Sequence, residues 1–275
     1  MWNKLFTPAL FLFALGIAAA HAQPAPPAPT APTAGGTAAK KAPPAKRSIV
    51  LVHGSWADGS SWDRVVPLLR AKGYKVVSVH LPLTGPADDV AAVQRAIAEQ
   101  PGDVTLVGHS YGGFVISEAG NDAKVKNLVY VDAFGLDAGE TANSLFKDKP
   151  PAWLKTLKID GGGFAWLPEA TVMNVFAYEL PEAERQLILA KQGPIPVKSF
   201  DEAAKNPAWK TKPSWYVHGK ADRIIPPDAQ ASMAKRMKAT VTSIDAGHLP
   251  MLSKPNDVAR VILTAATAPM AQARR

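Results

Sequence analysis

The chain has 275 residues, of which 47% are hydrophobic and 20% are charged. This balance excludes a disordered protein and supplies enough apolar side chains for one large domain with tails, or for two small domains. The absence of cysteine excludes disulfide bonds, thiolate metal sites, a cysteine nucleophile and a lipid anchor on cysteine.

The formal net charge of +8 arises in the terminal segments. Seven of the 31 basic residues lie before residue 48 or at the last two positions, whereas all 23 acidic residues lie between Asp58 and Asp257. A basic protein is a candidate for nucleic-acid binding. Charge confined to the tails is more typical of a soluble linker and a solvated end, so we expect no nucleic-acid partner.

Residues 1–22 have the pattern of a secretory signal peptide. Lys4 supplies a positive start, Leu5–Ala20 is almost entirely apolar, and a small-His-small tripeptide ends the segment at Ala22. Cleavage would leave Gln23 first and would export the protein, which predicts a periplasmic or secreted location. An uncleaved membrane anchor is the alternative, but the apolar run is short for a bilayer span. We expect no stable membrane insertion after cleavage.

Residues 23–47 are rich in proline and alanine, with seven and eight of these residues respectively. Proline favours extended polyproline II conformation, and the segment has no large apolar side chain to bury. We expect a semi-stiff, disordered linker with no chemistry of its own.

From Ser48 the pattern changes to strands that alternate with helices. The continuous β-branched run Ile49–Val52 predicts a strand buried on both faces, and further strands are predicted at Lys75–His80, Val104–Val107 and Val125–Val131. Apolar residues at helical spacing predict helices at Ser60–Ala71, which Ser60 or Ser61 can cap, Ala87–Gln100 and Tyr111–Gly120.

The alternation breaks at about residue 137 and returns after residue 205. The later elements are strands at Trp215–Val217 and Thr240–Ile244 and helices at Pro227–Met237 and Asn256–Ala265. Strands separated by helices predict a mostly parallel sheet with right-handed crossovers. We therefore expect an α/β domain over residues 48–270, with about six strands, helices on both faces, and a small cap at about 137–205 inserted after the fourth strand.

A nucleophile motif follows the third predicted strand directly. Gly108-His109-Ser110-Tyr111-Gly112 fits G-x-S-x-G in the strand–turn–helix context that the motif requires. Glycine at both ends has no Cβ to clash in so tight a turn. An ordinary glycine-rich turn is the alternative. We predict Ser110 as a nucleophile at the amino end of a helix, where partial positive charge suits an oxyanion.

A serine hydroxyl needs a base, and His248 is the predicted one. It lies in a polar loop after the last predicted strand. The histidine at position 21 leaves with the leader, those at 53, 80 and 218 end strands, and that at 109 lies inside the nucleophile turn. The chain has no cysteine and no HxH or HxxxH pattern, so we expect no metal site.

The histidine in turn needs an acid that holds its tautomer, and two aspartates are candidates. Asp222 follows the fifth predicted strand and gives the chain order Ser110, Asp222, His248 that goes with this kind of nucleophile turn. Asp132 follows the fourth strand at the same edge of the sheet. We predict Asp222 as the acid, with Asp132 as the rival; without that role, Asp132 would bond to nearby loop backbone.

Two backbone N–H groups are predicted to form an oxyanion hole. One is that of Tyr111, directly after the nucleophile, and the other comes from the loop after the first strand. In that loop Gly54 allows close approach, and we select Ser55, with Trp56 as second choice. A plain strand-to-helix turn is the alternative for this stretch.

Taken together, the motifs LVHGSW, VGHSYGG and GKADRIIP and the histidine loop resemble the α/β-hydrolase superfamily over residues 48–267. The segments VHGSWADGSSWDRVVPLLRAKGYKV and Ala246–Pro255 are similar to the plant methylesterase and hydroxynitrile lyase group, whose bacterial relatives are carboxylesterases. The resemblance implies hydrolysis of small or medium organic esters without a cofactor.

Two departures separate the chain from the lyases of that group. Those enzymes place a lysine directly after the catalytic histidine, where this chain has Leu249, and they tend to replace the glycine that is present here as Gly54. Relatives that act as dehalogenases, and most that act as epoxide hydrolases, carry aspartate at the nucleophile position, so Ser110 argues against both activities.

Aromatic residues are frequent in the cap. Most of them are expected to pack within the lid, but an aromatic cap over a serine predicts a largely apolar pocket that excludes water. We expect substrate contacts from Trp56, Trp166 and Phe176.

The resulting prediction is a serine hydrolase that cleaves small to medium, largely apolar carboxylic esters through an acyl-enzyme. Lactones, thioesters or amides are alternative substrates, because the same machinery serves them. A second hypothesis is a small-molecule binding protein with an inactive site on the same fold. The natural substrate and the oligomeric state cannot be deduced from the sequence.

Overall fold

The computed structural model describes residues 48–269. The predicted leader and linker, and residues 270–275, lie outside the described residues. Within them, six parallel strands form one sheet in the order β2-β1-β3-β4-β8-β9, which confirms the prediction of about six strands. The strands are β1 (Ser48–Val52), β2 (Val76–Val79), β3 (Val104–His109), β4 (Val125–Val131), β8 (Ser214–Gly219) and β9 (Thr240–Ile244).

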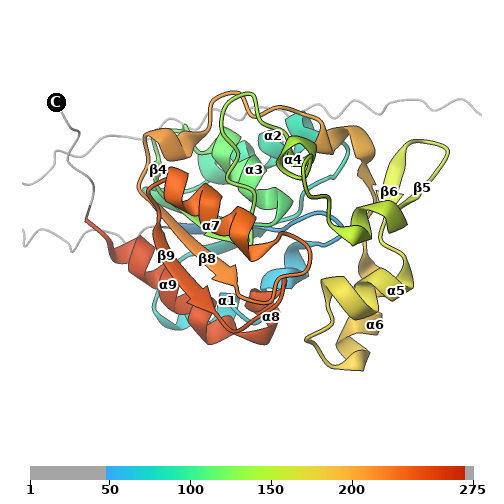
Figure 1. Cartoon of the computed structure of the whole chain (residues 1–275). Coiled ribbons are helices and arrows are strands. Elements are labelled where there is room, and N and C mark those ends of the chain that lie inside the picture. Colours follow the sequence, from blue (N-terminus) through green and yellow to red (C-terminus); the bar gives the residue numbers. More distant parts are fainter. Residues whose placement is uncertain (1–47, 270–275) are drawn as a thin grey trace, which may run out of the picture. The chain divides into compact units, whose positions relative to one another are not determined.

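Helices cover both faces of the sheet (Figure 1). On one face α1 (Val66–Ala71) packs against α9 (Pro255–Thr267), and α8 (Pro250–Ser253) precedes α9. The other face carries α2 (Pro86–Ala98), α3 (Tyr111–Ala119) and α7 (Pro227–Arg236). This division follows from right-handed crossovers, because the chain first moves outward from β1 to β2 and then back across the sheet. Helices on both faces explain why β1 and β3 are buried at every residue.

The predicted helix Ser60–Ala71 is wrong in its first half. The structure has a 3-10 turn, η1 (Gly59–Trp62), and only then α1. Pro67 lies in the first turn of α1, and its missing N–H cannot bond back to the preceding turn, so the helix begins near it. The cap of η1 is Asp58, whose Oδ1 accepts the Ser60 N–H at 2.7 Å, rather than Ser60 or Ser61.

The cap lies between β4 and β8 (Figure 1). Its only sheet among the described residues is antiparallel, in the order β5-β6-β7. The strands are β5 (Lys158–Ile159), β6 (Phe164–Trp166) and β7 (Ile195–Pro196), and the helices are α4 (Ala142–Leu145), α5 (Glu169–Thr171) and α6 (Glu182–Lys191). A π-helical turn, η3 (Val172–Phe176), follows α5. Short 3-10 turns at Ala152–Thr156, Val197–Phe200 and Ala208–Lys210 complete the connections.

A membrane-spanning helix is not found among residues 48–269, because none of the helices there is long and apolar enough. The six strands run parallel, so their carboxyl ends lie at one edge of the sheet. The loops after β1, β3, β4, β8 and β9 all leave from this edge, and they carry the residues of the candidate site.

Candidate active site

The turn after β3 holds Ser110 in a backbone conformation that few residues adopt. Its φ of 53° and ψ of −123° lie in a strained region, and α3 begins at the next residue. A Cβ on Gly108 would lie 2.4 Å from the carbonyl oxygen of Gly112, and a Cβ on Gly112 would lie 2.6 Å from that of His53. Both glycines are therefore required by close backbone approach, as the sequence indicates.

Three side chains from three loops form one hydrogen-bonded series. His248 Nε2 lies 3.0 Å from Ser110 Oγ, and His248 Nδ1 lies 2.8 Å from Asp222 Oδ2. A carboxylate only accepts hydrogen bonds, so Nδ1 carries the proton and Nε2 is the acceptor for the serine hydroxyl. The structure thus brings together the three residues that the sequence singles out for the reaction.

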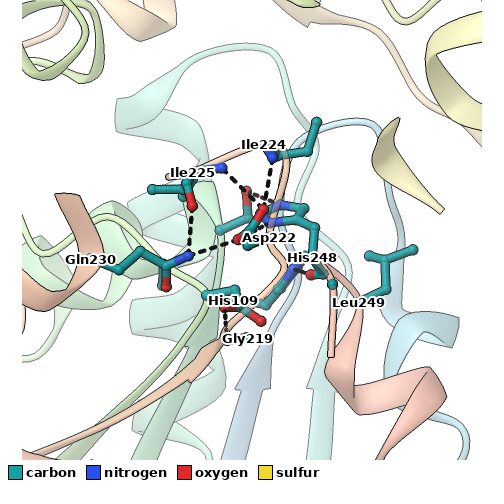
Figure 2. Close-up of polar contacts among 12 residues, drawn as sticks. His109, Gly219, Asp222, Ile224, Ile225, Gln230, His248 and Leu249 are labelled. Atoms are coloured by element: carbon teal, nitrogen blue, oxygen red, sulfur yellow. Dashed lines mark hydrogen bonds and ion pairs between the residues drawn. The ribbon is translucent and has the colours of Figure 1, made fainter. Parts of the chain in front are cut away.

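Asp222 is buried, and each of its carboxylate oxygens accepts two hydrogen bonds (Figure 2). Oδ1 accepts the backbone N–H groups of Ile224 and Ile225 at 2.7 and 3.1 Å. Oδ2 accepts from Gln230 Nε2 at 2.7 Å and from His248. These four donors occupy the acceptor positions of a carboxylate, so the side chain has one orientation toward the imidazole.

Asp132, the rival acid, makes no hydrogen bond to His248. Its Oδ1 accepts the N–H of Gly219 at 2.6 Å, at the end of β8, and its buried Oδ2 has no hydrogen-bond partner within the described residues. Burial, together with the nearby charge of Asp222, raises the pKa of the Asp132 carboxyl well above its ordinary value. The contact with the histidine is therefore made by Asp222, while Asp132 accepts from the backbone at the end of β8.

Three other histidines are buried in the described part of the chain, and each makes a structural contact. His53 Nε2 accepts the Leu81 N–H at 2.9 Å, and burial lowers the pKa of His53 to about 4. His218 Nε2 lies 2.8 Å from Ser243 Oγ. His109 Nε2 lies 2.8 Å from the backbone carbonyl oxygen of His248, and burial lowers the pKa of His109 well below its usual value (Figure 2). His109 is therefore neutral and donates to the loop that carries His248.

Both residues predicted to supply oxyanion donors are near the serine: Tyr111 follows it in the chain, and Ser55 lines the same pocket. Within residues 48–269 the backbone N–H groups of Ser55, Trp56 and Tyr111 donate to no protein acceptor. For Tyr111 the reason is its place as the first residue of α3, where N–H groups have no partner inside the helix. Donors left free next to a nucleophile are suited to bind a developing negative charge.

A narrow, mainly apolar pocket of about 10 Å³ lies at Ser110. Its walls include aromatic side chains from the cap and from the loops at the sheet edge, namely Trp56, Phe134, Phe146, Trp153 and Phe200. The Ser55 hydroxyl also lines it and has no hydrogen-bond partner among the described residues. The walls nearest the serine are therefore largely apolar, and the space between them is small.

A second, larger cavity of about 240 Å³ lies between η1 and α6. Ser110 is not among the residues that line it, whereas Trp56 lines both spaces and so stands between them. The Trp56 backbone has a φ of 58°, and its Nε1–H donates to the carbonyl oxygen of Ala165 in the cap at 2.9 Å. This ring also makes edge contacts with Trp153 and Phe176, which hold it in place.

The three predicted substrate contacts differ in their position. Trp56 lines the pocket at Ser110, and Phe176 lines the larger cavity with its ring centroid 5.5 Å from that of His248. Trp166 lies half-exposed on β6 and lines neither space. The alternation of β6 turns Ala165 rather than Trp166 into the interior, a direction that a three-residue strand does not reveal from its composition.

Several residues around the site have no signal in the sequence. Gln230 reaches Asp222 from α7, and Glu179 of the cap accepts hydrogen bonds from the loop of His248. Phe134, Phe146 and Phe200 line the serine pocket from separate segments. Their roles depend on contacts between distant parts of the chain, and no local spacing marks them.

The described fold and site can be compared with known proteins. The pattern of the alpha/beta hydrolase family matches residues 49–261. Methylesterase 3 of Arabidopsis thaliana is 27% identical over 254 residues, which cover 79% of this chain and 95% of that protein. The pyrethroid hydrolase of Sphingobium wenxiniae is 29% identical over 256 residues, which cover 80% of this chain and 88% of that protein.

Among solved structures, polyneuridine aldehyde esterase has the same fold. It superposes with a TM-score of 0.70 at 22% identity, over 80% of this chain and 98% of that chain. The sequence relatives thus include plant methylesterases, as the resemblance of the motifs implies.

Proposed function

The chain belongs to the alpha/beta hydrolase family, and its relatives include esterases. From this premise we propose that it is a serine hydrolase of carboxylic esters. The observation that carries the proposal is the unbroken series Ser110, His248, Asp222, with hydrogen bonds of 3.0 and 2.8 Å, beside free backbone donors.

The first half-reaction forms an ester between enzyme and substrate. Ser110 Oγ attacks the carbonyl carbon while His248 Nε2 takes the hydroxyl proton. The carbonyl oxygen becomes negative and accepts hydrogen bonds from the N–H groups of Ser55 and Tyr111. The tetrahedral adduct then collapses, the bond to the alcohol oxygen breaks, and the leaving alkoxide takes the proton from His248.

The second half-reaction releases the acid. Water enters, His248 Nε2 takes one of its protons, and the resulting hydroxide attacks the acyl carbon. Collapse breaks the bond to Ser110 Oγ, which recovers its proton from the imidazolium. In both halves Asp222 keeps the proton on Nδ1 and compensates the positive charge of the ring.

The pocket supports a largely apolar substrate of small to medium size. The space at Ser110 has mainly aromatic walls. The larger cavity beyond Trp56 is also lined by charged residues, namely Asp58, Asp63, Arg64, Glu184 and Lys191. We assign the group nearest the serine to an apolar part of the ester. Thioesters, lactones and amides belong in the same substrate panel.

The test is a Ser110→Ala variant together with a fluorophosphonate probe. The wild-type protein is expected to hydrolyse p-nitrophenyl esters and to become labelled at Ser110, because an activated serine reacts with this probe. The variant is expected to fold with an unchanged circular dichroism spectrum, to lose labelling, and to lose about 10³-fold or more in kcat.

Two outcomes would contradict the proposal. Undiminished turnover in the Ser110→Ala variant would place the nucleophile elsewhere. A folded wild-type protein whose Ser110 stays inert to the probe, and which turns over no ester of the panel, would favour the small-molecule binding protein instead.

A further inference from the structure

The loop that carries His248 has no regular secondary structure of its own. Its peptide groups therefore depend on partners elsewhere in the chain. Two of these partners are side chains that the mechanism above does not use: His109, which donates to the His248 carbonyl, and Glu179, which lies in the cap. The contacts of Glu179 are the more informative, because they join the cap to the base.

The carboxylate of Glu179 binds the loop on both sides of the histidine. Oε2 accepts the Gly247 N–H at 2.7 Å, and Oε1 accepts the Leu249 N–H at 3.3 Å. Thus one carboxylate holds the two peptide groups that flank His248, across a separation of about seventy residues in the chain. Hydrogen bonds to a charged acceptor are stronger than hydrogen bonds between neutral groups. We call these two hydrogen bonds of the Glu179 carboxylate the clamp.

The packing at Gly247 shows how closely the cap approaches. A Cβ at this position would lie 2.9 Å from Tyr178 Cε1 and 3.0 Å from Glu179 Oε1. Only glycine leaves room for both side chains, so the loop and this part of the cap are shaped to each other. Glu179 directly follows Tyr178, and the next residue, Leu180, is buried and anchors the segment in the core.

The same cap segment also contacts the loop of Asp222. The Tyr178 hydroxyl donates to the carbonyl oxygen of Ala221 at 2.9 Å. The Arg223 guanidinium lies 3.7 Å from the centre of the Tyr178 ring and donates to the carbonyl oxygen of Asn174 at 2.9 Å. Tyr178 and Glu179 therefore connect one piece of the cap to the two loops that carry the acid and the base.

We propose that Glu179 is a positioning residue that holds His248 in line with Ser110 and thereby couples the seating of the cap to the alignment of the base. The expected effect on the reaction rate rests on the proposed function. The two hydrogen bonds of the clamp do not depend on that function. A reaction that depends on a 3.0 Å contact between His248 and Ser110 is sensitive to small displacements of the loop.

The experiment compares Glu179→Ala and Glu179→Gln with the wild-type protein. For Glu179→Ala we expect kcat and the rate constant of fluorophosphonate labelling to fall together, on the order of 10- to 100-fold, because the loop shifts relative to the serine. KM is expected to stay within about 3-fold, since Glu179 lines neither pocket. Glu179→Gln keeps one acceptor oxygen and should show an intermediate loss.

Glu182→Gln is the matched control. It removes a carboxylate of the same charge from α6, in the same cap, that forms no hydrogen bond to either loop among the described residues. Its kcat and labelling rate are expected to equal those of the wild-type protein. Circular dichroism of each variant corrects the rates for the folded fraction.

A second measurement does not depend on catalysis. Amide hydrogen exchange at Gly247 and Leu249 should become about 10-fold faster or more in Glu179→Ala, because the acceptor of these two N–H groups is gone. Unchanged exchange, or a folded Glu179→Ala variant with wild-type kcat and labelling, would overturn the inference. A wild-type protein that is inert to esters but shows the exchange effect would refute the proposed function and leave the clamp standing.

Discussion

A Cβ atom on Gly54 would lie 2.6 Å from the Cβ atom of Ser110, although the two residues belong to different loops. Gly54 has only a hydrogen atom where other residues have a Cβ, so the loop after β1 can contact the turn of Ser110 directly. The same loop carries the N–H group of Ser55. The separation between Ser110 and the proposed oxyanion donor, the Ser55 N–H, therefore depends on the absence of a side chain at position 54.

Gly54→Ala is accordingly expected to impair the reaction more than the fold. The new methyl group must push the loop away from Ser110, which displaces one oxyanion donor and should lower kcat by about 10²-fold. Steady-state kinetics with p-nitrophenyl acetate would measure this. Gly102→Ala, where the added Cβ meets no atom within 4 Å, is the control and should retain wild-type kcat. Equal kinetics in both variants would contradict the role of this contact.

The buried carboxyl of Asp132 should make the stability of the protein depend on pH. Burial and the charge of Asp222 raise the pKa of the Asp132 carboxyl. The other groups that interact with this carboxyl are the Gly219 N–H, Gln230, Tyr216 and Glu179. The native state then binds the proton more tightly than the unfolded state does. Stability is therefore lost as pH rises from the ordinary carboxyl pKa toward the raised one.

Asp132→Asn should remove this loss, because asparagine keeps an acceptor for Gly219 and never ionises. We expect the variant to be more stable than the wild-type protein at about pH 8, by about 1–3 kcal/mol, and to gain little at about pH 4. Urea unfolding at the two pH values measures the difference. If Asp132→Asn raised the free energy of unfolding equally at both pH values, the Asp132 carboxyl would not be the group that titrates.

The size of the pocket at Ser110 should respond to Phe146. This ring is buried, lines the pocket, and packs 5.9 Å from Phe134 between ring centroids. Leucine is smaller than phenylalanine, so Phe146→Leu should enlarge the pocket at Ser110. The ratio of kcat/KM for p-nitrophenyl hexanoate to kcat/KM for the acetate should then rise about 10-fold. Phe164→Leu, on the half-exposed face of β6, lines neither space and serves as the control. An unchanged ratio in Phe146→Leu would place the acyl group elsewhere.

Export of the chain is a further proposal that a mass measurement can check. The apolar leader predicts cleavage after Ala22, so the protein recovered from outside the cytoplasm should begin at Gln23. Intact mass spectrometry would give the mature start directly. A recovered protein that still begins at Met1 would support an uncleaved anchor.

Much of the fold can be predicted from local patterns. The β-branched run at Ile49–Val52 predicts a strand buried on both faces, and β1 is buried at every residue. The Val125–Val131 and Thr240–Ile244 strands begin and end where the sequence predicts, although Thr240–Ile244 is a largely exposed strand at the edge of the sheet. The helix predicted over residues 60–71 is wrong in its first half. The spacing of apolar residues does not take account of Pro67, which restricts the backbone sterically. The cap is predicted only as a loss of regularity, since its strands have two or three residues each.

By itself the sequence determined the position of the proposed nucleophile, because the turn around Ser110 is local and its glycines, strand and helix are neighbours in the chain. Chain order favours Asp222 over Asp132, and the tertiary structure shows that only the Asp222 carboxylate contacts His248, because the two loops follow different paths from one edge of the sheet. It also decided that Glu179 of the cap holds the histidine loop, and that Trp56 rather than Trp166 borders the serine. Such contacts join segments far apart in the chain, and no periodicity within one segment records them.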